Sequence, residues 1–181
     1  MTYRRDLWEI AAHQHGIVTV RDAEEAGIPA VELRKLAQRE ALDSFGNGVY
    51  MHADVPLTRF SQPALAVKLA GERAMLHCEA VLDLVGVGQF NPPKIRVATT
   101  RRVRRTLPEW LALERRTDIS DENVTSYEGI LATTVAQALA DVRGRPSLLR
   151  WESMVDQAMG LGLVDKQDCE ALRLQTKEYS S

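Results

Sequence analysis

The sequence predicts an α+β protein of two domains, residues 1–55 and residues 56–181. Three short amphipathic helical segments and a two-stranded hairpin occupy the first fifty-odd residues. A proline-punctuated stretch over residues 54–63 follows, and beyond it strand-like and helix-like segments mix. A chain of 181 residues is long enough for one or two domains, each with its own core. The first domain has the order of a winged helix-turn-helix, and the second is expected to be a mixed α/β domain.

The first two helices are predicted from their apolar spacing and their ends. Leu7 and Ile10 share one helical face of the first segment, which ends at Gly16 and leads into a short apolar strand. Thr19 is placed to cap the second helix, because Asp22 three residues later completes a capping box. A tight connection then leads to the third helix, as a helix-turn-helix requires.

The third helix is expected to open at Ile28-Pro29, because proline is tolerated in a first helical turn, and it carries two different faces. Leu33 and Leu36 lie on the face that is expected to be buried. The opposite face recurs at spacings of three and four residues and is expected to be exposed. Its members are Val31, Arg34, Lys35 and Gln38.

A hairpin follows the third helix. The apolar runs 42–45 and 49–51 flank Gly46-Asn47-Gly48, and an Asn-Gly pair between apolar runs is a strong hairpin signal. This hairpin is the predicted wing.

The second domain reads as a few strands with several helices. Residues 95–97 alternate like a half-exposed strand, and residues 124–127 and 130–131 suggest two further strands. Helices are expected from residue 61, over 78–85, from Thr134 to Val142, from about residue 147 to 159, and after Asp165.

The net charge of −2 conceals a segregation along the chain. Residues 1–60 carry seven Lys/Arg against nine Asp/Glu, residues 61–116 carry ten against five, and residues 117–181 carry six against eleven. Six positive residues fall between 94 and 105 with no acid among them, which favours contact with phosphate or an acidic partner about as strongly as a solvated surface. They are Lys94, Arg96, Arg101, Arg102, Arg104 and Arg105.

Composition excludes several classes of protein. No stretch approaches the roughly 18 apolar residues of a membrane helix, and the N-terminus does not read as a signal peptide. Cys78 and Cys169 are isolated, so a disulfide framework or a cysteine metal cage is not expected. We therefore expect a cytoplasmic protein.

No catalytic constellation is evident. The sequence lacks a GxGxxG, a Walker loop, an HExxH and a GxSxG motif. His77 beside Cys78 stands at a helix start, where a capping or packed imidazole is expected, and His52 is expected at the surface. The chain is therefore predicted not to be an enzyme, with no catalytic residue, cofactor or metal site.

The exposed stripe of the third helix suits the major groove of DNA. Arginine can bind a guanine edge through two hydrogen bonds, glutamine an adenine edge, lysine a phosphate and valine a thymine methyl group. Thr19 and Arg21 start the second helix, where a hydroxyl and backbone N–H groups meet phosphate, and Arg39 and Asn47 would flank the contact. Residues 1–60 are acidic in sum, so strong DNA binding would need additional positive charge or a homodimer on a palindromic site. The additional charge could come from Arg101, Arg102, Arg104 and Arg105.

The chain resembles the AbiEi-type antitoxin family of bacterial toxin–antitoxin systems, which includes mycobacterial members. The resemblance rests on the order of short motifs: residues 16–28, Leu33-Arg-Lys-Leu-Ala37, Gly48-Val-Tyr50, residues 94–105, residues 129–141 and residues 156–164. The family usually has a glycine where the third helix meets the wing, and Arg39-Glu40-Ala41-Leu42 has none.

The resemblance implies an antitoxin that represses its own operon through the winged helix and neutralises a nucleotidyltransferase-like toxin through its second domain. Operator DNA and that toxin are then the partners, and no membrane is involved. The alternative is a stand-alone winged-helix regulator whose second domain dimerises or senses a ligand. A third is an interaction module that no longer binds DNA.

Overall fold

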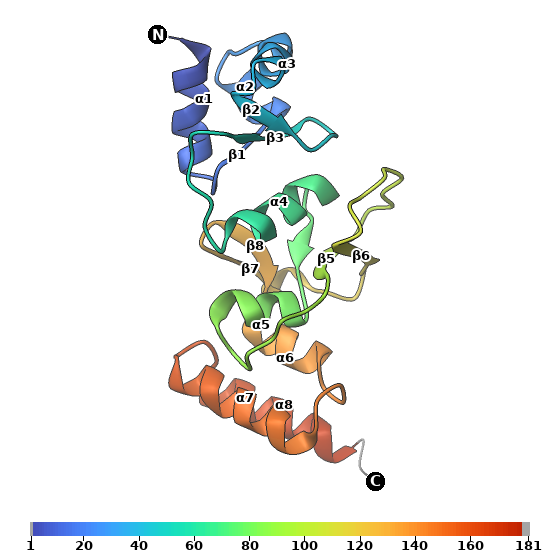
Figure 1. The fold of residues 1–181 in the computed structure, drawn as a ribbon. Helices are drawn as coiled ribbons and strands as arrows, with labels where there is room; N and C mark the ends of the chain where they lie inside the picture. Colours follow the sequence, from blue (N-terminus) through green and yellow to red (C-terminus); the bar gives the residue numbers. More distant parts are fainter. Residues whose placement is uncertain (1, 179–181) are drawn as a thin grey trace. The chain divides into compact units, whose positions relative to one another are not determined.

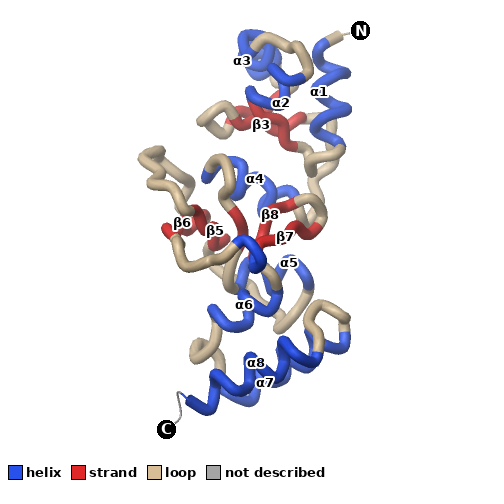
Figure 2. Tube along the Cα trace, turned by 180° about the vertical axis from the view of Figure 1, so that it is seen from behind, coloured by secondary structure: helices blue, strands red, loops and turns tan. Residues whose placement is uncertain are grey.

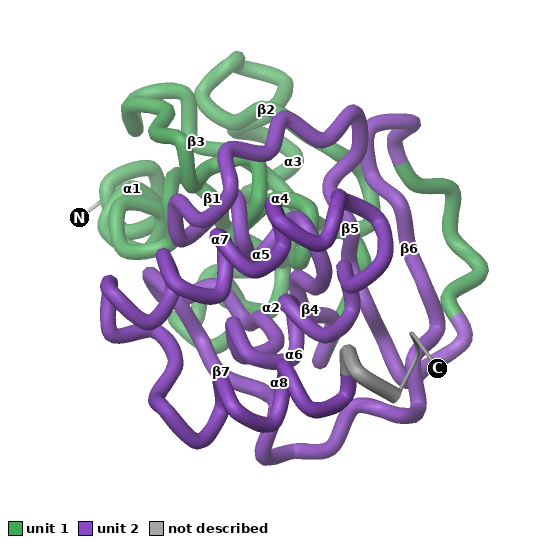
Figure 3. Tube along the Cα trace, turned by 90° about the horizontal axis from the view of Figure 1, so that it is seen from below, with its two compact units in different colours: residues 1–72, 103–107 green, residues 73–102, 108–181 purple. Residues whose placement is uncertain are grey.

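The computed structural model describes residues 2–178, which form two compact units. Unit 1 comprises Met1–Glu72 with Val103–Leu107, and unit 2 comprises Arg73–Arg102 with Pro108–Ser181 (Figure 3). Helices and β-sheets occur together, so the predicted α+β class is confirmed. No helix in the described part of the chain is long and apolar enough to cross a membrane.

Unit 1 places four helices around a small sheet (Figure 1). Its elements are α1 (Tyr3–Ala12), β1 (Ile17–Thr19), α2 (Val20–Glu25), α3 (Ala30–Gln38), β2 (Leu42–Ser44), β3 (Val49–His52) and α4 (Ser61–Ala70). The strands form an antiparallel sheet in the order β1-β3-β2.

One face of this sheet carries the core that orients α1, α2 and α3. Val18 lies opposite Tyr50 in the β1–β3 register, and both side chains are buried in this core. The remaining buried members come from the three helices, their connections and β2: Leu7, Ala23, Ile28, Leu33 and Leu42. Burial of these apolar side chains, at about 25 cal/mol per Å² of area removed from water, is the main stabilising term here.

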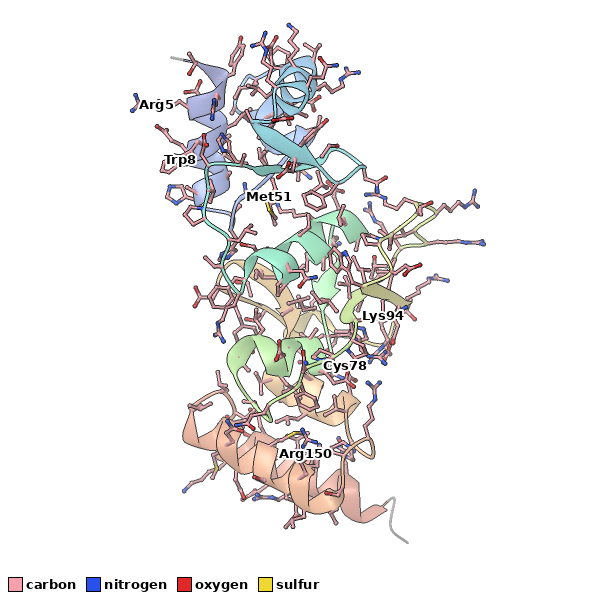
Figure 4. All side chains as sticks on the ribbon, in the orientation of Figure 1. Arg5, Trp8, Met51, Cys78, Lys94 and Arg150 are labelled. Carbon is pink, nitrogen blue, oxygen red and sulfur yellow. The ribbon has the colours of Figure 1, made fainter. Side chains whose placement is uncertain are left out.

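The other face of the sheet is covered by α4, which contacts β1 and β3. Met51 points from β3 toward this helix (Figure 4). All four residues of β3 are therefore buried, whereas a strand with one solvated face alternates. The expected division after residue 55 falls inside unit 1, because α4 packs on the sheet.

The expectation that His52 lies at the surface is wrong. Its side chain is buried, with Nε2 3.2 Å from the carbonyl oxygen of Arg4 in α1. The backbone N–H of Asp54 donates to His52 Nδ1 at 3.2 Å. Both ring nitrogens thus have backbone partners, which is how a buried imidazole is accommodated.

Unit 2 contains a second sheet and its helices (Figure 2). Its elements are β4 (Met75–Leu76), α5 (Glu79–Val85), β5 (Ile95–Thr99), β6 (Leu111–Arg115), a 3₁₀ turn (Asp121–Asn123), β7 (Val124–Tyr127), β8 (Ile130–Thr133), α6 (Val135–Asp141), α7 (Leu148–Gly160) and α8 (Lys166–Glu178). The strand order is β6-β5-β4-β8-β7.

The central strand β4 is only two residues long, yet it organises unit 2. It pairs antiparallel with β5 and parallel with β8, which brings together segments more than 50 residues apart. Both β4 and β8 run directly into helices, α5 and α6. Helices α7 and α8 pack on α6 and on each other, and the indole N–H of Trp151 donates to the carbonyl of Leu139 at 2.8 Å.

Candidate functional site

Helix α3 presents the predicted exposed stripe. Leu33 is fully buried in the core of unit 1, which fixes the rotation of the helix about its axis. The outward side chains are Val31, Arg34, Lys35 and Gln38. Lys35 Nζ lies 2.8 Å from Glu32 Oε1. No carboxylate in the described part of the chain is within ion-pair distance of Arg34, which leaves its guanidinium available to a ligand.

The end of α3 compensates for the missing glycine. Glu40 takes the left-handed conformation, with φ of +59°. Its N–H donates to the carbonyl of Ala37 at 3.1 Å, and the N–H of Ala41 donates to that of Leu36 at 3.0 Å. This is the Schellman pattern that glycine ordinarily forms. The chain thus leaves α3 by the usual geometry, at the cost of strain at Glu40.

The two residues at the start of α2 that are predicted to contact phosphate, Thr19 and Arg21, bind other residues of unit 1. The Thr19 hydroxyl accepts from the N–H of Asp22 at 3.1 Å, and Asp22 Oδ2 accepts from the N–H of Thr19 at 2.8 Å, so the predicted capping box is present. Arg21 pairs with Glu25 at 2.8 Å and also with Glu72. A DNA contact by Arg21 would therefore have to replace these ion pairs, which hold its pKa above the usual range through the Glu25 hydrogen bond.

The hairpin between β2 and β3 is tied to the start of α2. Gly46, Asn47 and Gly48 all have positive φ, which is the backbone of a tight hairpin. The N–H of Val20 donates to the carbonyl of Gly48 at 2.8 Å. Asn47 is exposed at the tip, as a flanking contact requires, and Arg39 is exposed at the end of α3.

The six basic residues predicted between positions 94 and 105 are divided between the two units. Arg96 on β5 pairs with Glu79 at 3.1 Å and with Glu114, both in unit 2. Lys94 is exposed beside it and lines a pocket of about 370 Å³ together with Arg96 and Phe90. The other four arginines belong to the segment between β5 and β6: Arg101, Arg102, Arg104 and Arg105.

Part of that segment belongs to unit 1. The compact unit that contains α1 to α4 includes Val103–Leu107. Arg105 donates from Nη1 to the carbonyl of Leu69 in α4 at 3.3 Å. Residues 1–72 carry eight Lys/Arg against ten Asp/Glu, so Arg104 and Arg105 bring unit 1 to neutrality. The charge deficit that the sequence indicates for the first domain is thereby removed.

A second polar cluster, in unit 2, was not predicted as a site. His77 and Cys78 connect β4 to α5, and both side chains are buried. His77 Nδ1 lies 3.1 Å from Cys78 Sγ, and Sγ lies 4.0 Å from Asp141 Oδ2 at the end of α6. Cys78 adopts φ of +54° and ψ of −135°, which a non-glycine residue rarely holds. Only the His-Cys pair between strand and helix marks this cluster in the sequence.

Burial controls the protonation of these groups. Burial raises the pKa of the Cys78 thiol to about 12. It also lowers the pKa of His77, against the opposing effect of Glu114. Because desolvation disfavours the charged form of each group, the His77 imidazole and the Cys78 thiol are both neutral at pH 7.

Two groups of ion pairs border the cluster. Arg116 binds Asp141 at 3.1 Å and Asp118 at 2.7 Å, and the hydrogen bond from Arg116 holds the pKa of Asp118 below its usual range. Arg145 pairs with Glu79, whose second oxygen meets Arg96. The group around Glu79 therefore links α5 with β5 and, through Glu114, with β6, while Arg116 holds the end of α6.

Comparison with known proteins supports the regulatory interpretation of the first unit. Residues 5–51 match the model of a family described as a transcriptional regulator, AbiEi antitoxin, which confirms the resemblance seen in the sequence over this segment. The crystal structure of the RV2827C protein from Mycobacterium tuberculosis is similar with a TM-score of 0.51 and 17% identity, covering 95% of this chain and 71% of that chain. At that identity the likeness concerns the fold alone. A comparison with curated proteins found no match.

Proposed function

We propose, from the family match over residues 5–51, that this chain is a DNA-binding antitoxin. Its first unit acts as a winged helix-turn-helix that binds the operator of its own operon, with α3 in the major groove and the β2–β3 hairpin as the wing. The observation that carries the proposal is the exposed stripe on α3 in the segment that matches a regulator family.

The roles of the DNA-contacting residues follow from exposure and chemistry. Arg34 and Gln38 are the base-reading side chains, because a guanidinium and an amide each form paired hydrogen bonds to a purine edge. Lys35 contacts phosphate after leaving Glu32, and Val31 contacts a thymine methyl group. Phosphate contacts by Asn47, Arg39 and Arg104 fix the register.

The DNA proposal is tested by fluorescence anisotropy with the duplex upstream of the gene. Arg34→Ala with Lys35→Ala should weaken binding at least tenfold, since a good base contact is worth about 1–3 kcal/mol. Arg4→Ala with Arg5→Ala is the matched control, since it removes the same charge from exposed positions of α1. An equal loss of DNA affinity in both double variants would show that net charge alone causes the effect. An unchanged affinity in the α3 double variant would favour an interaction module that does not bind DNA.

Neutralisation of a nucleotidyltransferase-like toxin is assigned to unit 2. Residues 117–181, which build β7, β8 and α6 to α8, carry six Lys/Arg against eleven Asp/Glu. An acidic surface complements a partner that handles nucleic acid. Co-expression should relieve the growth arrest caused by such a protein encoded next to this gene; absence of rescue would favour the stand-alone regulator.

A further inference from the structure

The polar cluster at the β4–α5 turn contains three different metal-ligating side chains. A ring nitrogen of His77, Cys78 Sγ and a carboxylate oxygen of Asp141 all lie within 4.8 Å of one another. A tetrahedral zinc ion binds sulfur at about 2.3 Å and nitrogen or oxygen at about 2.0–2.2 Å, so its ligand atoms stand roughly 3–4 Å apart. From these positions we infer that His77, Cys78 and Asp141 bind a zinc ion in unit 2.

The imidazole already has the orientation of a metal ligand. His77 is fully buried with Nδ1 directed at Cys78, while Nε2 has no hydrogen-bond partner in the described structure. Nε2 lies 3.7 Å from Glu114 Oε2. A zinc-bound histidine ordinarily donates its second N–H to a carboxylate, and a small approach of Glu114 completes that arrangement.

The Asp141 carboxylate is also held in place by hydrogen bonds from neighbouring side chains. The side chain of Asp141 is only 9% exposed. Its Oδ1 accepts from Gln137 Nε2 at 2.9 Å and from Arg116 Nη2 at 3.1 Å. Its Oδ2 accepts from Arg116 Nη1 at 3.2 Å and lies 4.0 Å from Cys78 Sγ, so binding of a metal ion by Oδ2 replaces the bond from Nη1. Arg116 keeps two bonds of 2.7 Å to Asp118, so it remains paired when Oδ2 turns to a metal ion.

The charges of the cluster favour a divalent cation. The ion pairs of the cluster join three arginines to four carboxylates, so the formal charges of these groups sum to one negative charge. When zinc binds, the Cys78 thiol loses its proton to solvent and becomes a thiolate, so the ion adds two positive charges and the thiolate one negative charge. The formal charges of these groups, the thiolate and the ion then sum to zero, which lowers the cost of placing the ion beside the buried Cys78 thiolate. The carboxylates are Glu79, Glu114, Asp118 and Asp141, and the arginines are Arg96, Arg116 and Arg145.

The donor set selects zinc over harder cations. A thiolate and an imidazole with one carboxylate suit zinc, whereas magnesium and calcium prefer oxygen alone. Three protein ligands leave the fourth position to water. A zinc ion bound by Cys78 and Asp141, which are 63 residues apart in the chain, holds the strained β4–α5 turn against the end of α6.

The test uses the untagged full chain titrated with cobalt(II), which reports thiolate ligation by a charge-transfer absorption band. The wild type should bind one cobalt ion with this band, and zinc should displace it. Cys78→Ser should abolish the band and Asp141→Asn should weaken binding, while Cys169→Ser, which removes the other buried thiol, should leave the spectrum unchanged. Glu114→Gln should lower affinity roughly 10–100-fold without removing the band.

Circular dichroism of each metal-free variant separates a lost site from a lost fold. If Cys78→Ser does not fold, Asp141→Asn and Glu114→Gln decide, together with the zinc content of wild-type protein purified without chelator. A wild type without the thiolate band, a band that survives in Cys78→Ser, or one that disappears in Cys169→Ser would each overturn the assignment.

Discussion

The backbone N–H of Val20 donates to the carbonyl oxygen of Gly48 at 2.8 Å, so the first residue of α2 is fixed to the tip of the β2–β3 hairpin. The contact is close. A Cβ on Gly48 would lie 3.1 Å from Val20 Cγ2, and Gly48 has φ of +74°. The position of the proposed wing beside the helix pair thus depends on the absence of a side chain at residue 48.

We predict that Gly48→Ala destabilises the protein by about 2 kcal/mol, from left-handed strain and the overlap with Val20. Gly46→Ala is the matched control, because Gly46 also has positive φ but no atom within 4 Å of its Cβ position. It should cost only about 1 kcal/mol. Urea denaturation measures both, and equal costs would show that the Val20 contact is unimportant.

Relief of the backbone strain at the end of α3 should increase the stability of the protein. Glu40→Gly should stabilise the protein by about 1 kcal/mol, because glycine adopts φ of +59° without strain. Glu40→Ala keeps the Cβ and should leave the free energy of unfolding nearly unchanged. Thermal unfolding of the two variants discriminates them; a gain with alanine would trace the effect to removal of the carboxylate instead.

Arg104 and Arg105, in the segment that joins β5 to β6, are expected to have different roles. Arg104 is exposed, so Arg104→Ala should lower the salt dependence of DNA binding by about one unit of slope while leaving stability unchanged. Arg105→Ala should also cost about 1 kcal/mol of stability, because Arg105 donates to Leu69. Anisotropy at several salt concentrations and urea denaturation measure the two effects. A slope that Arg104→Ala leaves unchanged would exclude a phosphate contact.

The Arg4–Asp54 pair predicts a pH effect in unit 1. The hydrogen bond from Arg4, at 2.6 Å, holds the pKa of the Asp54 carboxyl below its usual range. A depressed folded pKa contributes stability above the unfolded pKa, and that stability is lost as pH falls through the folded pKa. NMR titration should show Asp54 titrating at low pH, and Arg4→Ala should return its pKa toward the ordinary value. An unchanged titration curve would assign the shift to other neighbours.

Local signals predicted the first unit well. The capping box of Thr19 and Asp22, the hairpin at Asn47 and the exposed side of Arg34 all depend on residues within four positions of one another. Capping, turn conformation and helical periodicity are short-range effects, so a single sequence suffices for them.

What only the tertiary structure decided involves residues far apart in the chain. Packing of α4 on the sheet buries all of β3, and His52 is buried because it meets the backbone of Arg4. The parallel pairing of β4 with β8 brings Cys78 within reach of Asp141. Such contacts depend on how separate elements pack, which local spacing does not encode. The sequence by itself determined the helices, the hairpin and the exposed stripe; the fold determined which buried polar groups came together.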